Sequence, residues 1–153
     1  MAFTIRFTDG QFSDEDSTWA VGHIVAGELD EDFLSDLCEW DKRAYESQWL
    51  QSLEGLLSGD SKAVLITHYV NQGKSLDLGW WALYRDGDAV RVQNHFPFGD
   101  FKGEFSVPQA SKFLQERMTV DEDRNSLSEW HVPLRDIELF VAQIKQQRTD
   151  FPK

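Results

Sequence analysis

The sequence predicts one α+β domain, built on a mostly antiparallel, twisted sheet with about three helices. Segments in which apolar and polar residues alternate, or in which β-branched residues gather, are typical of strands. Segments with apolar residues every three or four positions are typical of amphipathic helices. Runs of strands are mixed with helices, which favours an antiparallel sheet. The 153 residues, in which we find no repeat or linker, suit a single domain over 1–153.

The N-terminal part of the chain favours strands. Apolar and polar residues alternate over residues 3–7, which predicts a strand with one buried face, and Asp9-Gly10 predicts a turn after it. Residues 19–25 are predicted to form the second strand. Residues 27–38 are acidic with scattered Leu and Phe, and we expect an edge strand or an extended segment there.

The clearest helix is predicted over residues 41–57. The carboxylate of Asp41 can accept hydrogen bonds from the free N–H groups of the first turn and so begin the helix. Apolar residues recur with helical spacing and form one face: Tyr45, Trp49, Leu53 and Leu56.

Three strands are predicted in the middle of the chain, over residues 62–69, 76–84 and 89–94. Asp86-Gly87 between the last two is a strong hairpin signal, because these residues tolerate positive φ. We expect these strands to supply much of the core: Leu65, Trp81, Leu83 and Val92.

The adjacent tryptophans Trp80 and Trp81 must point to opposite faces of a strand. Either a helix covers the second face of the sheet, which we favour, or one tryptophan is an exposed anchor for a partner.

The C-terminal part is predicted to begin with a short helix over residues 108–118, because proline is tolerated in a first helical turn. A short strand over 128–132 and a helix over 133–147 follow. The helix turns apolar residues inward: Leu134, Ile137, Phe140, Val141 and Ile144.

The charge is concentrated at one end of the chain. Of a net charge of −12, residues 1–60 carry −11, with 14 Asp and Glu against 3 Lys and Arg. From Phe7 to Asp41 there are 11 acids and no Lys or Arg. Such a segment repels nucleic acid and attracts a basic protein. Solubility alone is the alternative explanation.

Catalytic and metal-binding motifs are weak or absent. The thiol of Cys38 lies near carboxylates that raise its pKa, and Glu129 lacks a second group to pair with in acid–base chemistry. Asp121-x-Asp123-x-Asn125 begins like a calcium loop, but Ser126 and Val132 replace the required Gly and Glu. None of the four histidines has metal-ligand spacing: His23, His68, His95 and His131. We expect no enzyme activity, no cofactor and no metal.

Three features that the sequence lacks predict the cellular compartment: a cysteine pair, a signal peptide and a membrane-spanning segment. A single cysteine excludes an internal disulfide, which fits a reducing compartment. The N-terminus lacks the features of a signal peptide, and no segment is apolar enough to span a membrane. We therefore expect a cytoplasmic protein that does not bind a membrane.

A series of short motifs resembles one family. Over residues 40–145 the chain is similar to the immunity proteins of contact-dependent growth inhibition systems, the CdiI family, in particular the Enterobacter cloacae-type group. Residues 1–35 match only in the first hydrophobic strand and in acidity. Pro133 departs from members that have a polar cap before the last helix. The motifs are Trp40, Tyr45-x-x-x-Trp49-x-x-x-Leu53, the strand around Leu65, Trp81-x-Leu83-Tyr84, the Asp86-Gly87-Asp88 turn, Val90-x-Val92-Gln93-Asn94, Phe113-x-x-x-Arg117 and Ser128-Glu129-Trp130.

The resemblance implies a cytosolic, non-catalytic immunity-protein domain with a fold like that of Whirly proteins. Its partner would be the C-terminal toxin domain of an effector delivered by a neighbouring cell, commonly a nuclease and hence basic. The resemblance implies no shared set of toxin-contacting residues, so we predict them from charge: Asp14, Glu15, Asp16, Asp30, Glu31, Asp32 and Asp36. Two alternatives stay open, a single-stranded nucleic-acid-binding or other acidic regulatory protein, and a metal-dependent enzyme that uses the carboxylate clusters.

Overall fold

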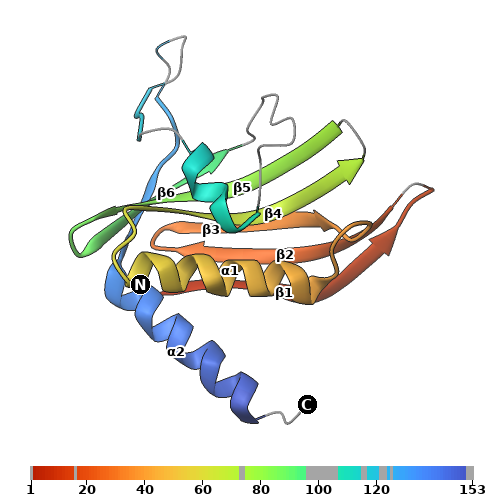
Figure 1. Cartoon of the computed structure of the whole chain (residues 1–153), viewed down its shortest axis with the longest axis horizontal. Coiled ribbons are helices and arrows are strands. Elements are labelled where there is room, and N and C mark those ends of the chain that lie inside the picture. Colours follow the sequence, from red (N-terminus) through yellow and green to blue (C-terminus); the bar gives the residue numbers. More distant parts are fainter. Residues whose placement is uncertain are drawn as a thin grey trace.

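The computed structural model describes residues 2–15, 17–72, 75–95, 107–114, 117–120, 124 and 126–150. It contains two antiparallel sheets with strand orders β1-β2-β3 and β4-β5-β6-β7, which we call the N-terminal sheet and the central sheet (Figure 1). The α+β prediction is confirmed, with two sheets in place of one. The elements are β1 (Phe3–Ser13), β2 (Thr18–Ala26), β3 (Leu29–Asp36), α1 (Lys42–Leu57), β4 (Lys62–Gln72), β5 (Ser75–Asp86), β6 (Ala89–His95), the 3₁₀ helix η1 (Val107–Phe113), β7 (Trp130–Pro133) and α2 (Leu134–Asp150).

The N-terminal sheet is a meander of three strands. The predicted strands over residues 3–7 and 19–25 are both present, and the acidic segment forms the edge strand β3. The turn predicted at Asp9-Gly10 is wrong. Those residues lie inside β1, where the register shifts between Phe7 and Gln11. A bulge absorbs the irregularity there, so the strand continues to Ser13.

Helix α1 protects the outer edge of the central sheet. Gln48 bonds both to the carbonyl of Val64, at 3.0 Å, and to the N–H of Ile66, at 2.8 Å. The indole of Trp49 donates to the carbonyl of Ile66 at 2.6 Å. An edge strand exposes unpaired backbone groups with which another chain can pair. On β4 the side chains of Gln48 and Trp49 form hydrogen bonds with such groups. Asp41 caps the helix as predicted.

The central sheet is buried on both faces along β5. Trp80 and Trp81 are 1% and 2% exposed, so neither is a surface anchor. The ring of Trp81 packs edge-on against Trp130 of β7. The residues predicted for the core are all buried: Leu65, Trp81, Leu83 and Val92. The turn between β5 and β6 has Gly87 at φ 62°, as the Asp-Gly signal predicts.

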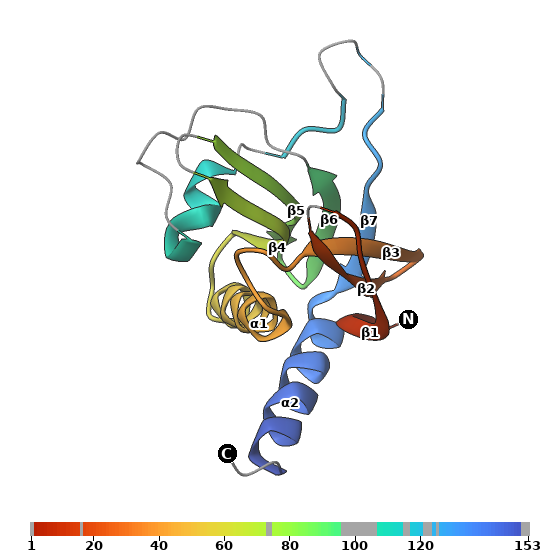
Figure 2. The ribbon, with the colours of Figure 1, turned by 90° about the vertical axis from the view of Figure 1, so that its right-hand side faces the viewer.

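The C-terminal elements differ in part from the prediction. The helix predicted over 108–118 is the 3₁₀ helix η1, which ends at Phe113, so the described residues contain two α-helices rather than about three. Helix α2 follows β7 directly, contacts α1 and β1, and then extends beyond the sheets (Figure 2). None of the helices in the described ranges is long and apolar enough to cross a membrane.

Candidate functional site

One face of the N-terminal sheet is turned to solvent. Ile5, Ile24 and Ala26 lie on its other face, in the hydrophobic core. Because side chains alternate along a strand and paired residues share a face, the strand register defines the solvent side. We call this side the outer face. It carries Arg6 and Phe12 from β1, Trp19, Val21, His23 and Val25 from β2, and Asp30, Asp32, Leu34 and Asp36 from β3.

Two of the predicted acids meet at a histidine on the outer face. The Nε2 atom of His23 lies 2.7 Å from Asp30 Oδ1, and its Nδ1 atom lies 2.5 Å from Asp32 Oδ1. The hydrogen bond to Asp32, helped by the charge of Asp30, raises the pKa of His23 above its usual value. Both carboxylates are still 67–70% exposed. The histidine therefore holds the two acids side by side and leaves them accessible to a cation.

The sequence does not predict this role of His23. His23 is opposite Asp32 only in the observed register of β2 and β3, and a shift of one residue would send the histidine to the other face. The one signal available is the spacing of Asp30 and Asp32, two positions apart on a strand.

Asp14 and Glu15 lie in the turn between β1 and β2, at the opposite end of the outer face. Asp14 accepts a hydrogen bond from the N–H of Ser17 at 2.8 Å and another from the indole of Trp19 at 3.1 Å. Glu15 is exposed. The six residue steps from Asp30 to Asp36 span about 20 Å of strand, so exposed acids border the outer face at two separated ends.

The other three predicted site residues differ from these. Asp16 lies outside the described residues. Glu31 is exposed at the sheet edge but is paired with the core residue Ile24, so it lies on the opposite face to Asp30.

The prediction that Asp36 forms part of a charged interface needs correction, because its side chain is buried and only 4% exposed. Burial would raise its pKa, but hydrogen bonds from the Cys38 N–H and the Ser17 hydroxyl outweigh it and lower the pKa. The backbone carbonyl of Asp36 accepts from the Tyr45 hydroxyl at 2.6 Å. Asp36 therefore fixes the connection from β3 to α1.

The segment that forms the N-terminal sheet is strongly negative. Residues 3–36 contain nine Asp and Glu residues and one basic residue, Arg6, a net charge of −8 with neutral histidine. A surface of one sign speeds the approach of a partner of the other sign. It disfavours nucleic acid, whose phosphates need Lys and Arg.

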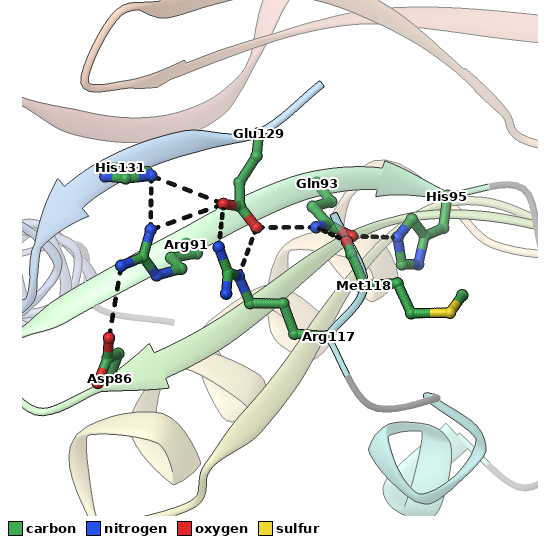
Figure 3. Close-up of polar contacts among 8 residues, drawn as sticks. All are labelled: Asp86, Arg91, Gln93, His95, Arg117, Met118, Glu129 and His131. Atoms are coloured by element: carbon green, nitrogen blue, oxygen red, sulfur yellow. Dashed lines mark hydrogen bonds and ion pairs between the residues drawn. The ribbon is translucent and has the colours of Figure 1, made fainter. Parts of the chain in front are cut away.

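Glu129 is the centre of a second polar cluster, on the central sheet (Figure 3). Arg117 binds both of its carboxylate oxygens, at 2.6 and 2.7 Å, and Gln93 donates to it at 2.8 Å. The hydrogen bonds from Arg117 outweigh desolvation and hold the pKa of Glu129 at about 2. A carboxyl group with this pKa is ionised at neutral pH and is a poor general acid or base. This arrangement fits a structural role.

The described residues offer little for catalysis or metal binding. In these ranges no group of three or more His, Cys, Asp and Glu side chains has the geometry to hold a metal ion. Desolvation and the Asp36 carboxylate raise the pKa of the Cys38 thiol, which disfavours the reactive thiolate. Residues 121–123 and 125, which begin like a calcium loop, lie outside the described residues.

Comparisons with known proteins agree with one another. A family model described as the CdiI N-terminal domain matches residues 35–140. A curated relative, the immunity protein CdiI of Enterobacter cloacae subsp. cloacae, is 33% identical over 115 residues, which are 74% of this chain and 79% of the relative. A solved CdiA-CT/CdiI toxin and immunity complex from Enterobacter cloacae contains a chain that matches with a TM-score of 0.85 and 28% identity. That match covers 94% of this chain and 99% of the other, and it does not confirm the predicted likeness to Whirly proteins.

Proposed function

Because the chain belongs to the CdiI N-terminal domain family, we propose that it is an immunity protein that binds and neutralises a cognate CdiA-CT toxin domain. The observation that carries the proposal is the likeness, over nearly the whole chain, to a structure described as a toxin and immunity complex. In this proposal the protein acts in the cytoplasm by occupying the toxin. It catalyses no reaction, needs no cofactor and binds neither nucleic acid nor membrane.

The outer face of the N-terminal sheet, with the acids at its ends, is the proposed toxin-binding surface. The exposed acids on or beside this face are Asp14, Glu15, Asp30 and Asp32, and Glu31 adds negative charge from the other face of the same edge strand. Asp36 acts indirectly, because its carboxylate is committed to Cys38 and Ser17.

The proposed toxin presents a basic surface, as a nuclease does to hold a polyanion. Carboxylates that approach such a surface compete with its substrate and raise the association rate ~10–10³-fold at low salt.

The test compares two double charge reversals of equal size. Glu15→Lys with Asp30→Lys changes the acids that border the outer face, at two exposed side chains. Asp88→Lys with Glu138→Lys makes the same change of net charge at exposed positions in the β5–β6 turn and on α2. Association with the purified cognate CdiA-CT domain is followed at several salt concentrations.

We expect the first pair to slow association about tenfold or more at low salt and to weaken its salt dependence. The second pair changes only the net charge and has a much smaller effect. If the two pairs behave alike, the acids of the N-terminal sheet are not the contact surface. If the unmodified chain neither binds the toxin nor protects cells that express it, the proposed function itself is wrong.

A further inference from the structure

An apolar strip crosses the middle of the outer face and is not explained by folding. Phe12 and Leu34 are each 47% exposed, high values for large apolar side chains. Phe12 is the cross-strand partner of Trp19, and Leu34 is the partner of Val21. These four residues from three strands thus share one face as neighbours. We call Phe12, Trp19, Val21 and Leu34 the apolar strip.

We propose that the apolar strip is the energetic centre of the toxin-binding surface, and that it packs against an apolar patch of the toxin bordered by Lys and Arg. This inference rests on the proposed function. It adds which residues of the surface set the dissociation rate and which set the association rate. Scattered apolar side chains are ordinary on a protein surface, whereas a contiguous group bordered by polar residues marks an interaction site.

The position of the strip supports this assignment. Along β3, Leu34 follows Asp30 and Asp32, and on the other side of the strip Asp14 lies in the turn beside Trp19. Acids therefore border the apolar residues at two ends, which is the arrangement of an interface with an apolar centre and a polar rim. The charge of this rim selects a basic partner over a second copy of the same acidic chain.

Two details keep the strip open and rigid. The indole N–H of Trp19 is held by Asp14 at 3.1 Å, and its ring stacks on His68 of β4 with centroids 5.9 Å apart. A side chain that is already fixed loses little entropy on binding. Gly10 lies over Val21, and a Cβ atom there would come within 3.1 Å of a Val21 methyl group. Glycine at this place adds no side chain over Val21.

The strip and the acids contribute to different steps of binding. Exposed charges act over about 10 Å at moderate salt, so they set the association rate and its salt dependence. Apolar contacts act only when the surfaces touch, so they set the dissociation rate. The proposal therefore predicts that the two sets of variants have separable kinetic effects.

The experiment measures dissociation of the purified CdiA-CT domain from immobilised full-length variants. Phe12→Ser and Leu34→Ser each remove an exposed apolar side chain without creating a cavity. Leu139→Ser is the matched control, because Leu139 is 59% exposed on α2 and lies beside Phe3 and Thr4, at the opposite end of β1 from Phe12. Leu34→Met keeps the apolar character and tests whether the loss is specific. Thermal unfolding of every variant verifies that the fold is retained.

We expect Phe12→Ser and Leu34→Ser to speed dissociation about 10- to 100-fold, with association changed less than about threefold. Leu139→Ser and Leu34→Met should stay within about threefold of the unmodified chain. Dissociation at the unmodified rate in both serine variants overturns the inference but leaves the proposed function intact, provided that the unmodified chain binds. A concentration-dependent dimer that only these two variants abolish, with toxin dissociation unchanged, assigns the strip to a second copy and also overturns it.

Discussion

Replacing Glu129 by Gln tests whether the polar cluster of the central sheet stabilises the fold through charge. Gln keeps the size of the side chain and can still accept a hydrogen bond, but it leaves Arg91 and Arg117 without their shared carboxylate. The pKa of Glu129 falls from an ordinary 4.5 to about 2. A difference of this size is worth at most about 3 kcal/mol. Since the guanidinium of Arg117 is exposed to water, we expect about 1–2 kcal/mol.

The pH dependence identifies the cause. A carboxyl group whose pKa is lowered by folding stabilises the folded chain above its unfolded pKa, and that contribution is lost as the pH falls toward the folded value. The destabilisation by Glu129→Gln should therefore be full at pH 7 and should shrink between about pH 4.5 and pH 2.

Urea unfolding followed by tryptophan fluorescence at pH 7, 5, 4 and 3 measures the free energy of unfolding. The control is Glu138→Gln, at an exposed position on α2, which should change stability by less than about 0.5 kcal/mol. The reasoning is refuted if Glu129→Gln destabilises the chain equally at pH 3 and pH 7, or if its effect at pH 7 matches that of the control.

Two further predictions concern stability. Gln48→Ala leaves the Val64 carbonyl and the Ile66 N–H without their side-chain partner at a buried sheet edge. We expect it to lower the free energy of unfolding, measured in urea, by about 2–4 kcal/mol. The control Gln51→Ala, on the exposed side of α1, should lower it far less. Folding raises the pKa of His23, so its ion pairs with Asp30 and Asp32 stabilise the chain fully below pH 6.5 and lose that effect as the pH rises through the folded pKa. The free energy of unfolding of the unmodified chain should lose this increment as the pH rises from about 6.5 through the raised pKa of His23. His23→Gln should abolish this loss.

Much of the fold follows from local sequence signals. Helix α1 has both a cap and a regular apolar face, and the β5–β6 hairpin has an Asp-Gly turn, so both could be predicted. The division into two sheets could not be predicted, because it depends on which strand edges pair with one another in the folded chain. Gln48 and Trp49 occupy the backbone groups of β4, a role that helical spacing does not reveal. The Asp9-Gly10 turn fails for a similar reason, since a bulge can absorb the same residues that begin a turn.

The candidate site is harder to predict than the fold. Charge counting finds the acidic segment, because composition requires no structure. It cannot separate Asp32, which is exposed, from Asp36, which is buried and bonded to the connection before α1. Both lie on the same row of β3, and only the packing of that connection distinguishes them. The apolar strip is hidden for the same reason, since Phe12 joins Trp19 only after the bulge resets the register of β1.

The proposed surface and the recognisable part of the family occupy different segments of one fold. The family model begins at residue 35, near the end of β3, so Phe12, Leu34 and the exposed acids of the proposed surface all lie before it. Yet the structural likeness covers 94% of the chain, which requires the relative to share most of the N-terminal sheet. The core face of that sheet packs against α1 through the contacts of Phe7 and Phe33 with Trp49. Most of its outer face has no such constraint, because Phe12, Leu34 and the exposed acids point to solvent. A sheet held from one side can change its partner without changing its fold, which suits the proposed binding of one cognate toxin.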